Sequence, residues 1–273
     1  MKKIKLYIQF YREISRVLIS RVFQLPYRDR MVHLFSLDND KIGDYISAAG
    51  FYEIGNLYAF KFFLDTKGTL PGAAVDIGAN IGNHTAFFAN LFDQVYAFEP
   101  HPALFKILQG NLIWNSIKNT ICFNLALGRE AKSSYINQKK NFNSGTFMLG
   151  SSDINSHEVE ITTADEIFLN HEQVIVFVKI DVEGFEKDVL QGMKQTIKRH
   201  QPIIWFEAEN RENANSTIEL LRTMGYQCFR TPWPSAQKKG SIKRYLMTPY
   251  RRFELVNLDQ IHDQHYSCII ATV

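Results

Sequence analysis

The chain has 273 residues, of which 45% are hydrophobic and 22% charged, and these values argue against an intrinsically disordered protein. The net charge of +3 gives no indication of a nucleic-acid partner, and we expect none. The three cysteines lie far apart in the sequence, which argues against a paired-cysteine zinc site and is typical of reduced thiols in a cytoplasmic protein.

The first 70 residues predict a helical segment that packs on the rest of the chain. Within residues 1–35, apolar residues recur at three- and four-residue spacing beside basic ones, as in an amphipathic helix with a basic face. Such a helix either packs on the main domain, which we favour, or contacts an anionic membrane surface. No apolar run reaches the roughly 18 residues of a membrane-spanning helix, and no signal-peptide pattern is present. We therefore expect a cytoplasmic location, with the inner face of the membrane as an alternative site.

From residue 71 onward the pattern alternates between strands and helices. This alternation predicts an α/β domain over 71–273 with a mostly parallel, doubly wound sheet. Residues 128–165 lack helical periodicity and predict a hairpin insertion, and residues 232–252 predict a basic loop. Strands are expected at 73–76, 94–98, 120–126, 174–181, 202–207, 227–230, 253–258 and 267–272, and helices at 83–91, 102–115, 186–199 and 213–224.

Two motifs follow the first two expected strands and indicate a ligand site. The first, Asp76-Ile77-Gly78-Ala79-Asn80-Ile81-Gly82, joins a strand to a helix; its glycines permit a tight turn, and its acid suits an ammonium group. Its glycine spacing differs from the dinucleotide-binding GxGxxG pattern. The second motif, Phe98-Glu99-Pro100, places a carboxylate where it can accept both hydroxyls of a ribose.

A third motif, Lys179-Ile180-Asp181-Val182-Glu183-Gly184-Phe185-Glu186, ends the fourth strand of the predicted sheet. Ligands of such sheets bind at the carboxyl ends of the strands. A lysine inside an apolar strand is costly unless it is paired, so we expect Lys179 to meet a carboxylate: Asp181, Glu183 or Glu207. A purely structural ion pair is the alternative to a catalytic group.

The segments DIGANIG, FEP and KIDVEGFE together resemble the FkbM family of methyltransferases, over roughly residues 44–227. The resemblance implies a Rossmann-like class I methyltransferase fold, in which one C-terminal strand, here 267–272, runs antiparallel. It also implies transfer of a methyl group from S-adenosylmethionine to oxygen, commonly on a glycan or a small-molecule alcohol. That cofactor carries both the ammonium group and the unphosphorylated ribose that the first two motifs suit.

Roles for individual residues follow from this cofactor. We expect a catalytic group of Lys179, Asp181 and Glu183, with one carboxylate receiving the proton of an acceptor hydroxyl. The predicted cofactor-binding residues are Asp76, Gly78, Asn80, Gly82 and Asn83 for the methionine end, Glu99 and Pro100 for the ribose, and Asn124 and Ala126 for the adenine.

The sequence is also compatible with a metal site and with two other functions. The same carboxylates suit magnesium, but no ligand signature demands a metal and we expect none. A nicotinamide-dependent oxidoreductase shares the fold, although the missing GxGxxG argues against it. A non-catalytic Rossmann-like protein at a membrane surface is the other alternative. Nothing in the sequence indicates the oligomeric state.

Overall fold

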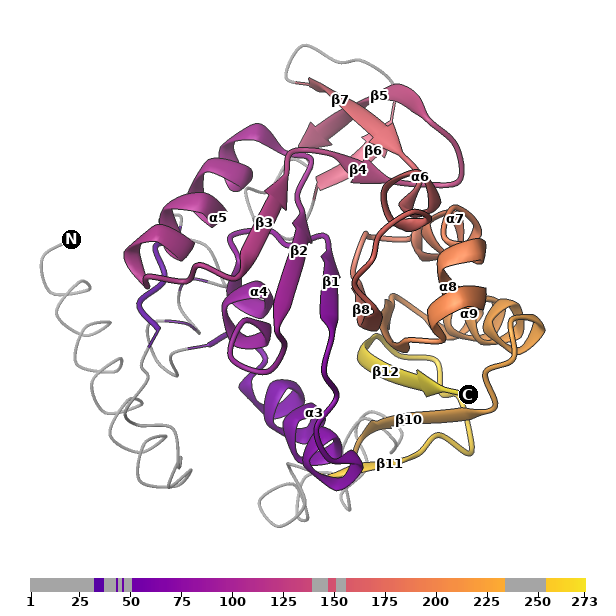
Figure 1. The fold of residues 1–273 in the computed structure, drawn as a ribbon. Coiled ribbons are helices and arrows are strands. Elements are labelled where there is room, and N and C mark those ends of the chain that lie inside the picture. The colour runs from indigo at the N-terminus through magenta and orange to yellow at the C-terminus, as the bar shows by residue number, and fades with distance from the viewer. Residues whose placement is uncertain are drawn as a thin grey trace, which may run out of the picture.

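The computed structural model describes residues 32–36, 43, 46, 51–138, 147–150, 156–233 and 254–273. Most of the predicted basic helix of residues 1–35 and nearly all of the predicted basic loop lie outside these ranges. The described part is an α/β structure with two sheets (Figure 1).

The larger sheet has the strand order β11-β10-β12-β9-β8-β1-β2-β3. Its parallel strands are β1 (Ala73–Ile77), β2 (Gln94–Phe98), β3 (Thr120–Phe123), β8 (Ile175–Ile180) and β9 (Ile203–Ala208). The C-terminal strands are β10 (Cys228–Pro232), β11 (Leu255–Asn257) and β12 (Tyr266–Thr272). Strand β12 runs antiparallel to both of its neighbours, β9 and β10, which confirms the predicted antiparallel C-terminal strand and the Rossmann-like class I arrangement.

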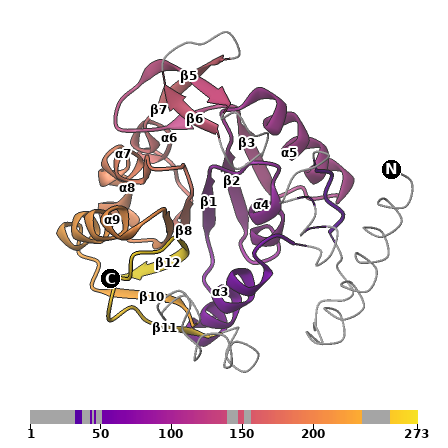
Figure 2. The same cartoon turned by 180° about the vertical axis from the view of Figure 1, so that it is seen from behind.

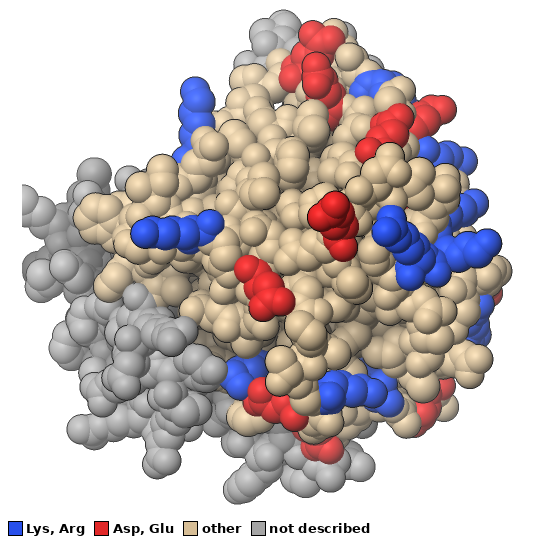
Figure 3. All heavy atoms as spheres, in the orientation of Figure 1, with Lys and Arg blue, Asp and Glu red and all other residues tan. Residues whose placement is uncertain are grey.

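Helices cover both faces of this sheet (Figures 1 and 2). On one face lie α3 (Ile54–Lys67), α4 (Asn83–Phe88) and α5 (Pro102–Trp114). On the other lie α6 (Ala164–Phe168), α7 (Glu186–Gln191), α8 (Lys194–His200) and α9 (Arg211–Thr223). Basic side chains gather over α7 and α8 on the solvent side (Figure 3), as expected for the outer surface of amphipathic helices.

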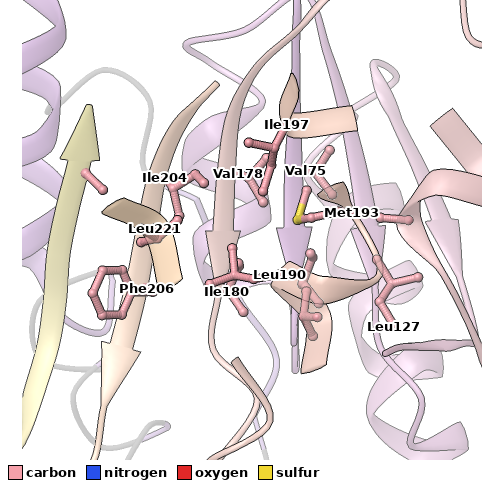
Figure 4. Packing of buried hydrophobic residues seen from close by; sticks show 14 of the residues in the cluster. Val75, Leu127, Val178, Ile180, Leu190, Met193, Ile197, Ile204, Phe206 and Leu221 are labelled. Atoms are coloured by element: carbon pink, nitrogen blue, oxygen red, sulfur yellow. The ribbon is translucent and has the colours of Figure 1, made fainter. Parts of the chain in front are cut away.

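Alternation along each strand divides the core between these two faces. Val178, Ile204 and their neighbours pack against α7, α8 and α9 (Figure 4), and each fully buried side chain of this size contributes roughly 1.5–3 kcal/mol. Phe177 and Trp205 point the other way, into the cluster formed with α3 and α4. By the same alternation three polar side chains, Asp76, Lys179 and Glu207, share the α3/α4 face at the carboxyl ends of their strands.

The helix expected over 186–199 is two helices, α7 and α8, so that prediction was wrong. The break falls at Gly192, where the chain passes close to the backbone of Gly128. A β-carbon added at Gly192 would lie 1.8 Å from the Gly128 carbonyl oxygen. The carbonyl of Gly192 in turn accepts a hydrogen bond from the Asp165 amide, at 2.9 Å. This backbone approach, invisible to helical periodicity, decides where α7 ends.

Replacing Gly192 by alanine is expected to lower the free energy of unfolding by about 1–3 kcal/mol, because the backbone must move to admit the methyl group. Urea unfolding would measure the change. Gly110 is a matched control: it lies in α5, and a β-carbon there would meet nothing within 4 Å. Gly110→Ala should raise stability by about 0.5–1 kcal/mol, and equal effects of the two substitutions would contradict this account.

The strand expected over 120–126 also divides, into β3 and β4 (Ala126–Leu127). The chain leaves the main sheet at Asn124, whose side-chain amide donates to the carbonyls of Glu99 and Pro100, at 2.8 and 2.9 Å. Strand β4 instead joins a second sheet of order β4-β7-β5-β6, with β5 (Lys132–Gln138), β6 (Phe147–Gly150) and β7 (His157–Thr162). This sheet occupies the region for which a hairpin insertion was predicted.

Candidate functional site

The loop between β1 and α4 is a tight turn built on left-handed residues. Gly78, Asn80 and Gly82 have φ angles of 80°, 52° and 87°. A β-carbon on Gly78 would lie 1.9 Å from the carbonyl oxygen of Asp181. Glycine is therefore required at position 78, both for its conformation and for the close approach of this loop to the end of β8.

Glu99, at the end of β2, is directly joined to this loop. Its carboxylate accepts hydrogen bonds from the backbone amides of Asn80 and His101, each at 2.8 Å. Burial raises the pKa of Glu99 to about 7; the two backbone bonds oppose this, and the nearby charges of Asp76 and Asp181 add to it. The structure thus brings the first two motifs together at the carboxyl edge of the sheet.

Lys179 lies in the interior between two aspartates. Its Nζ is 2.9 Å from Asp181 Oδ2 and 3.7 Å from Asp76 Oδ1, and its side chain is 2% exposed. The expected pairing with Asp181 is confirmed, and Asp76, its cross-strand neighbour in β1, is an additional partner that the sequence did not suggest. Burial acts to lower the pKa of Lys179, but the charges of Asp181 and Asp76 raise it above its usual value. This lysine is therefore a fixed positive charge.

Asp76 lies beneath the loop rather than in it. Its side chain is fully buried, and its Oδ2 accepts a hydrogen bond from Thr85 Oγ1 at 2.5 Å. Its Oδ1 has no hydrogen-bond partner among the residues that the structure describes and faces Lys179. The carboxylate is thus directed at Thr85 and Lys179.

Asp181 forms a carboxyl pair with Glu207, at the end of β9. The two side chains are hydrogen-bonded to each other. Burial raises the pKa of Glu207 to about 11, and the charge of Asp181 adds to this. Burial acts to raise the pKa of Asp181 as well, but Lys179 and the hydrogen bonds hold it below its usual value. Lys179 therefore favours the negative charge on Asp181 and leaves the proton on Glu207.

Two residues that sequence reasoning missed, Glu53 and His265, border this pair. Glu207 Oε1 contacts His265 Nε2, in the segment before β12. Glu53, at the N-terminus of α3, lies 3.5 Å from Nε2 of the buried His84 and raises the pKa of Glu207 through its charge. Both come from outside the motifs, so no local spacing could have indicated them.

The remaining predicted residues have varied surroundings. Glu183 lies past the end of β8, in a turn with a φ of 50°, so the strand alternation that would align it with Lys179 has ended. Asn83 is buried; its side chain accepts from the Tyr52 amide at 2.8 Å and donates to the Tyr52 carbonyl at 3.1 Å. Ala126 is buried in β4 and Pro100 is half-buried. His101 caps the N-terminus of α5.

Two features are absent from the described ranges of the chain. Within them, no group of three or more His, Cys, Asp or Glu side chains is arranged to hold a metal ion. In the same ranges no helix has the length and apolar character needed to cross a bilayer.

Comparison with known proteins gives matches among methyltransferases. Methyltransferase 1 of Beauveria bassiana (strain ARSEF 2860) is 30% identical over 142 residues, which are 44% of this chain and 57% of the relative. A methyltransferase FkbM from Methylobacillus flagellatus KT is 16% identical with a TM-score of 0.48, over 84% of this chain and 52% of that one. A precorrin-6y C5,15-methyltransferase from Geobacter metallireducens GS-15 is 14% identical with a TM-score of 0.41, over 81% of this chain and 89% of that one.

The chain thus spans little more than half the length of its curated relative. The family model described as "Methyltransferase FkbM domain" matches residues 76–228, which contain all three motifs. This match argues against the nicotinamide-dependent oxidoreductase. Because it covers more than half of the sequence, the chain belongs to the FkbM family of methyltransferases.

Proposed function

We propose that this chain transfers a methyl group from S-adenosylmethionine to a hydroxyl of a glycan, a glycolipid or a related small molecule. The observation that carries this proposal is the position of Asp181. It is an ionised carboxylate, held by Lys179 at 2.9 Å, and it lies at the same strand edge as Glu99 and the β1–α4 loop. An alcohol acceptor requires a base beside the proposed donor site, because its hydroxyl must lose a proton as it attacks the methyl carbon.

The described residues fit S-adenosylmethionine. Each oxygen of Glu99 accepts one backbone hydrogen bond and so keeps one lone pair, which leaves the carboxylate able to accept both hydroxyls of a ribose. The left-handed loop through Gly78 and Gly82 lets a ligand approach the backbone closely. Asn80 and Asn83 belong to this proposed methionine end, and Pro100, Asn124 and Ala126 to the ribose and adenine side. The full burial of Asp76 favours a supporting role beneath the loop.

The cofactor, when bound, supplies an electrophilic methyl carbon. The chain's own task is then to hold the acceptor oxygen in line, exclude water and remove one proton. Asp181 is our candidate for the proton acceptor, and Lys179 keeps it ionised. Glu183, in the adjoining turn, is proposed to border the acceptor.

Glu99→Ala is expected to weaken S-adenosylmethionine binding by about 30- to 100-fold, as hydrogen bonds to a charged group contribute about 1.5–3 kcal/mol. Calorimetry should also detect proton release when the wild-type protein binds the donor near pH 7. The pKa of Glu99 is about 7 without ligand, so roughly half of the molecules carry a proton that hydroxyl donors would displace.

Exposed Glu130 offers the matched control, since Glu130→Ala should bind the donor like wild type. Equal affinity of the Glu99→Ala and wild-type proteins would remove the ribose role.

We propose that the acceptor is anionic and that the protein methylates it at or near the inner face of the membrane. The support is in the sequence: basic residues in segment 1–35 and in loop 232–252, the latter beside aromatic residues that suit sugar rings. To test this, the full chain would be incubated with labelled methyl donor and a cell-envelope extract. The extract would then be separated into neutral glycans, anionic glycans and glycolipids, and the label in each fraction measured. Alkali-stable label in an anionic fraction is expected. Label on protein alone, or none, would count against O-methylation of a glycan.

A further inference from the structure

A continuous chain of polar groups connects Asp181 with solvent. Asp181 is hydrogen-bonded to Glu207, and Glu207 Oε1 contacts His265 Nε2. His265 is the most exposed of the three: 53% of its side chain is exposed, compared with 28% for Asp181 and 22% for Glu207. The inner end lies beside the proposed donor site and the outer end lies in water.

The carboxyl pair in this chain holds one proton. Two carboxylates cannot form a hydrogen bond to each other unless a proton lies between them, because their charges repel. The ammonium group of Lys179, 2.9 Å from Asp181, stabilises the negative charge on that partner. The resting pair is therefore an Asp181 carboxylate and a Glu207 carboxylic acid.

We propose that Asp181, Glu207 and His265 form a relay that carries the proton of the acceptor hydroxyl from the reaction site to solvent. This inference rests on the proposed function and extends it to two residues, Glu207 and His265, that act through Asp181. His265 is a relay residue at the surface, and Glu207 joins it to the base.

The proposed relay moves one proton from the acceptor hydroxyl to solvent. The acceptor O–H bond breaks as its oxygen bonds to the methyl carbon, and the proton goes to Asp181, so that the pair holds two protons and no charge. The carboxyl group of Glu207 then rotates its O–H from Asp181 toward His265, and this proton passes to Nε2 of His265 as the O–H bond of Glu207 breaks. The proton on Asp181 moves to Glu207, which restores the resting pair, and the imidazolium of His265 releases its proton to water.

The charges around the pair favour this resting state. Lys179 of β8, Glu53 at the start of α3 and His84 of α4 act on the pair directly, and Asp76 of β1 lies 3.7 Å from the Lys179 ammonium group. Glu53 raises the pKa of Glu207, whereas Lys179 and His84 lower the pKa of Asp181. Lys179 also lowers the pKa of Glu207, but burial and the charges of Asp181 and Glu53 outweigh this effect, so the proton stays on Glu207 and the negative charge on Asp181.

A first test needs no acceptor. Infrared spectroscopy of the wild-type chain at about pH 9 should show the carbonyl stretch of a protonated carboxyl, because the pKa of Glu207 is about 11 while that of Glu99 is about 7. The signal should disappear in the isosteric variant Glu207→Gln and persist in Glu99→Gln. A wild-type protein without the signal, or a Glu207→Gln protein that retains it, would overturn the relay.

A second test measures turnover with the extract fraction that the wild-type protein labels. At low buffer concentration His265→Gln should lower the rate of methyl incorporation by about tenfold, with the KM for S-adenosylmethionine unchanged, and added imidazole should restore the rate. His262→Gln, three residues away in the same segment, is the matched control and should match wild type. Full activity of His265→Gln, or a loss that imidazole does not restore, would overturn the relay.

The two tests separate this inference from the proposed function. If no fraction accepts label while the infrared signal behaves as expected, the proposed acceptor chemistry fails and the carboxyl pair stands. If label is transferred and His265→Gln is unaffected, the proposed function stands and the relay fails.

Discussion

Asp181→Asn is expected to lower the turnover number by about 10²- to 10⁴-fold while the affinity for S-adenosylmethionine changes little. The amide keeps the shape of the side chain and its contact with Lys179 but cannot accept the acceptor's proton. Donor affinity should persist because Glu99 and the β1–α4 loop bind through other groups. Turnover would be measured as labelled methyl transfer, and affinity by calorimetry.

Asp188 serves as the matched control for this variant. It lies in α7, only seven positions from Asp181, and its ion pair with Arg129 is at the surface. Asp188→Asn should therefore transfer methyl groups at the wild-type rate. Wild-type turnover by Asp181→Asn would remove Asp181 as the base, and a loss of donor affinity equal to the loss of turnover would reassign it to cofactor binding.

Lys179→Met is expected to reduce the free energy of unfolding by about 3–5 kcal/mol. Methionine fills the same space, so the loss reflects the buried carboxylate of Asp76 and the half-buried carboxylate of Asp181, which would remain in place without their cation. Urea unfolding would measure the difference from wild type. Lys187→Met, on the exposed side of α7, should change stability by no more than about 0.5 kcal/mol.

The pH dependence of this loss has a definite sign. In the wild-type protein Lys179 holds the pKa of Asp181 below its usual value, so the pair contributes stability above the unfolded pKa and loses it as the pH falls through the folded pKa. Without the lysine, burial raises that pKa, and the variant loses stability as the pH rises. The difference between the two proteins should therefore be greater at about pH 8 than at about pH 5. A difference independent of pH would indicate lost packing instead.

Much of the fold could be predicted because strand and helix periodicities reflect burial on two faces of one sheet. The strands expected at 73–76, 94–98 and 174–181 agree with β1, β2 and β8 within two residues at either end. Errors arose where backbone met backbone. The break at Gly192 depends on Gly128, sixty-four positions earlier, and no pattern along a helix reports such an approach.

The candidate site was predictable where a motif ends a strand, as for the pairing of Lys179 with Asp181. The surroundings of Glu207 could not be predicted, because Glu53 precedes β1 in the sequence and His265 precedes β12. His265 contacts Glu207, and Glu53 acts on it through its charge, only in the folded chain. Asn83, which directly follows the first motif, has a structural contact that its position in the sequence did not predict: its side-chain amide holds the backbone of Tyr52. Residue type and spacing do not distinguish this use of an amide from ligand binding.

The two hydrogen bonds between Asn83 and Tyr52 have a consequence for the design of truncated fragments. The family match begins at residue 76, yet Asn83 and His84 in α4 are covered by residues 52 and 53, more than twenty positions upstream. A fragment that begins at residue 76 would lack Glu53, the partner of His84, and would leave the two hydrogen bonds between Asn83 and Tyr52 unmade. We therefore expect a stably folded fragment to start before residue 52.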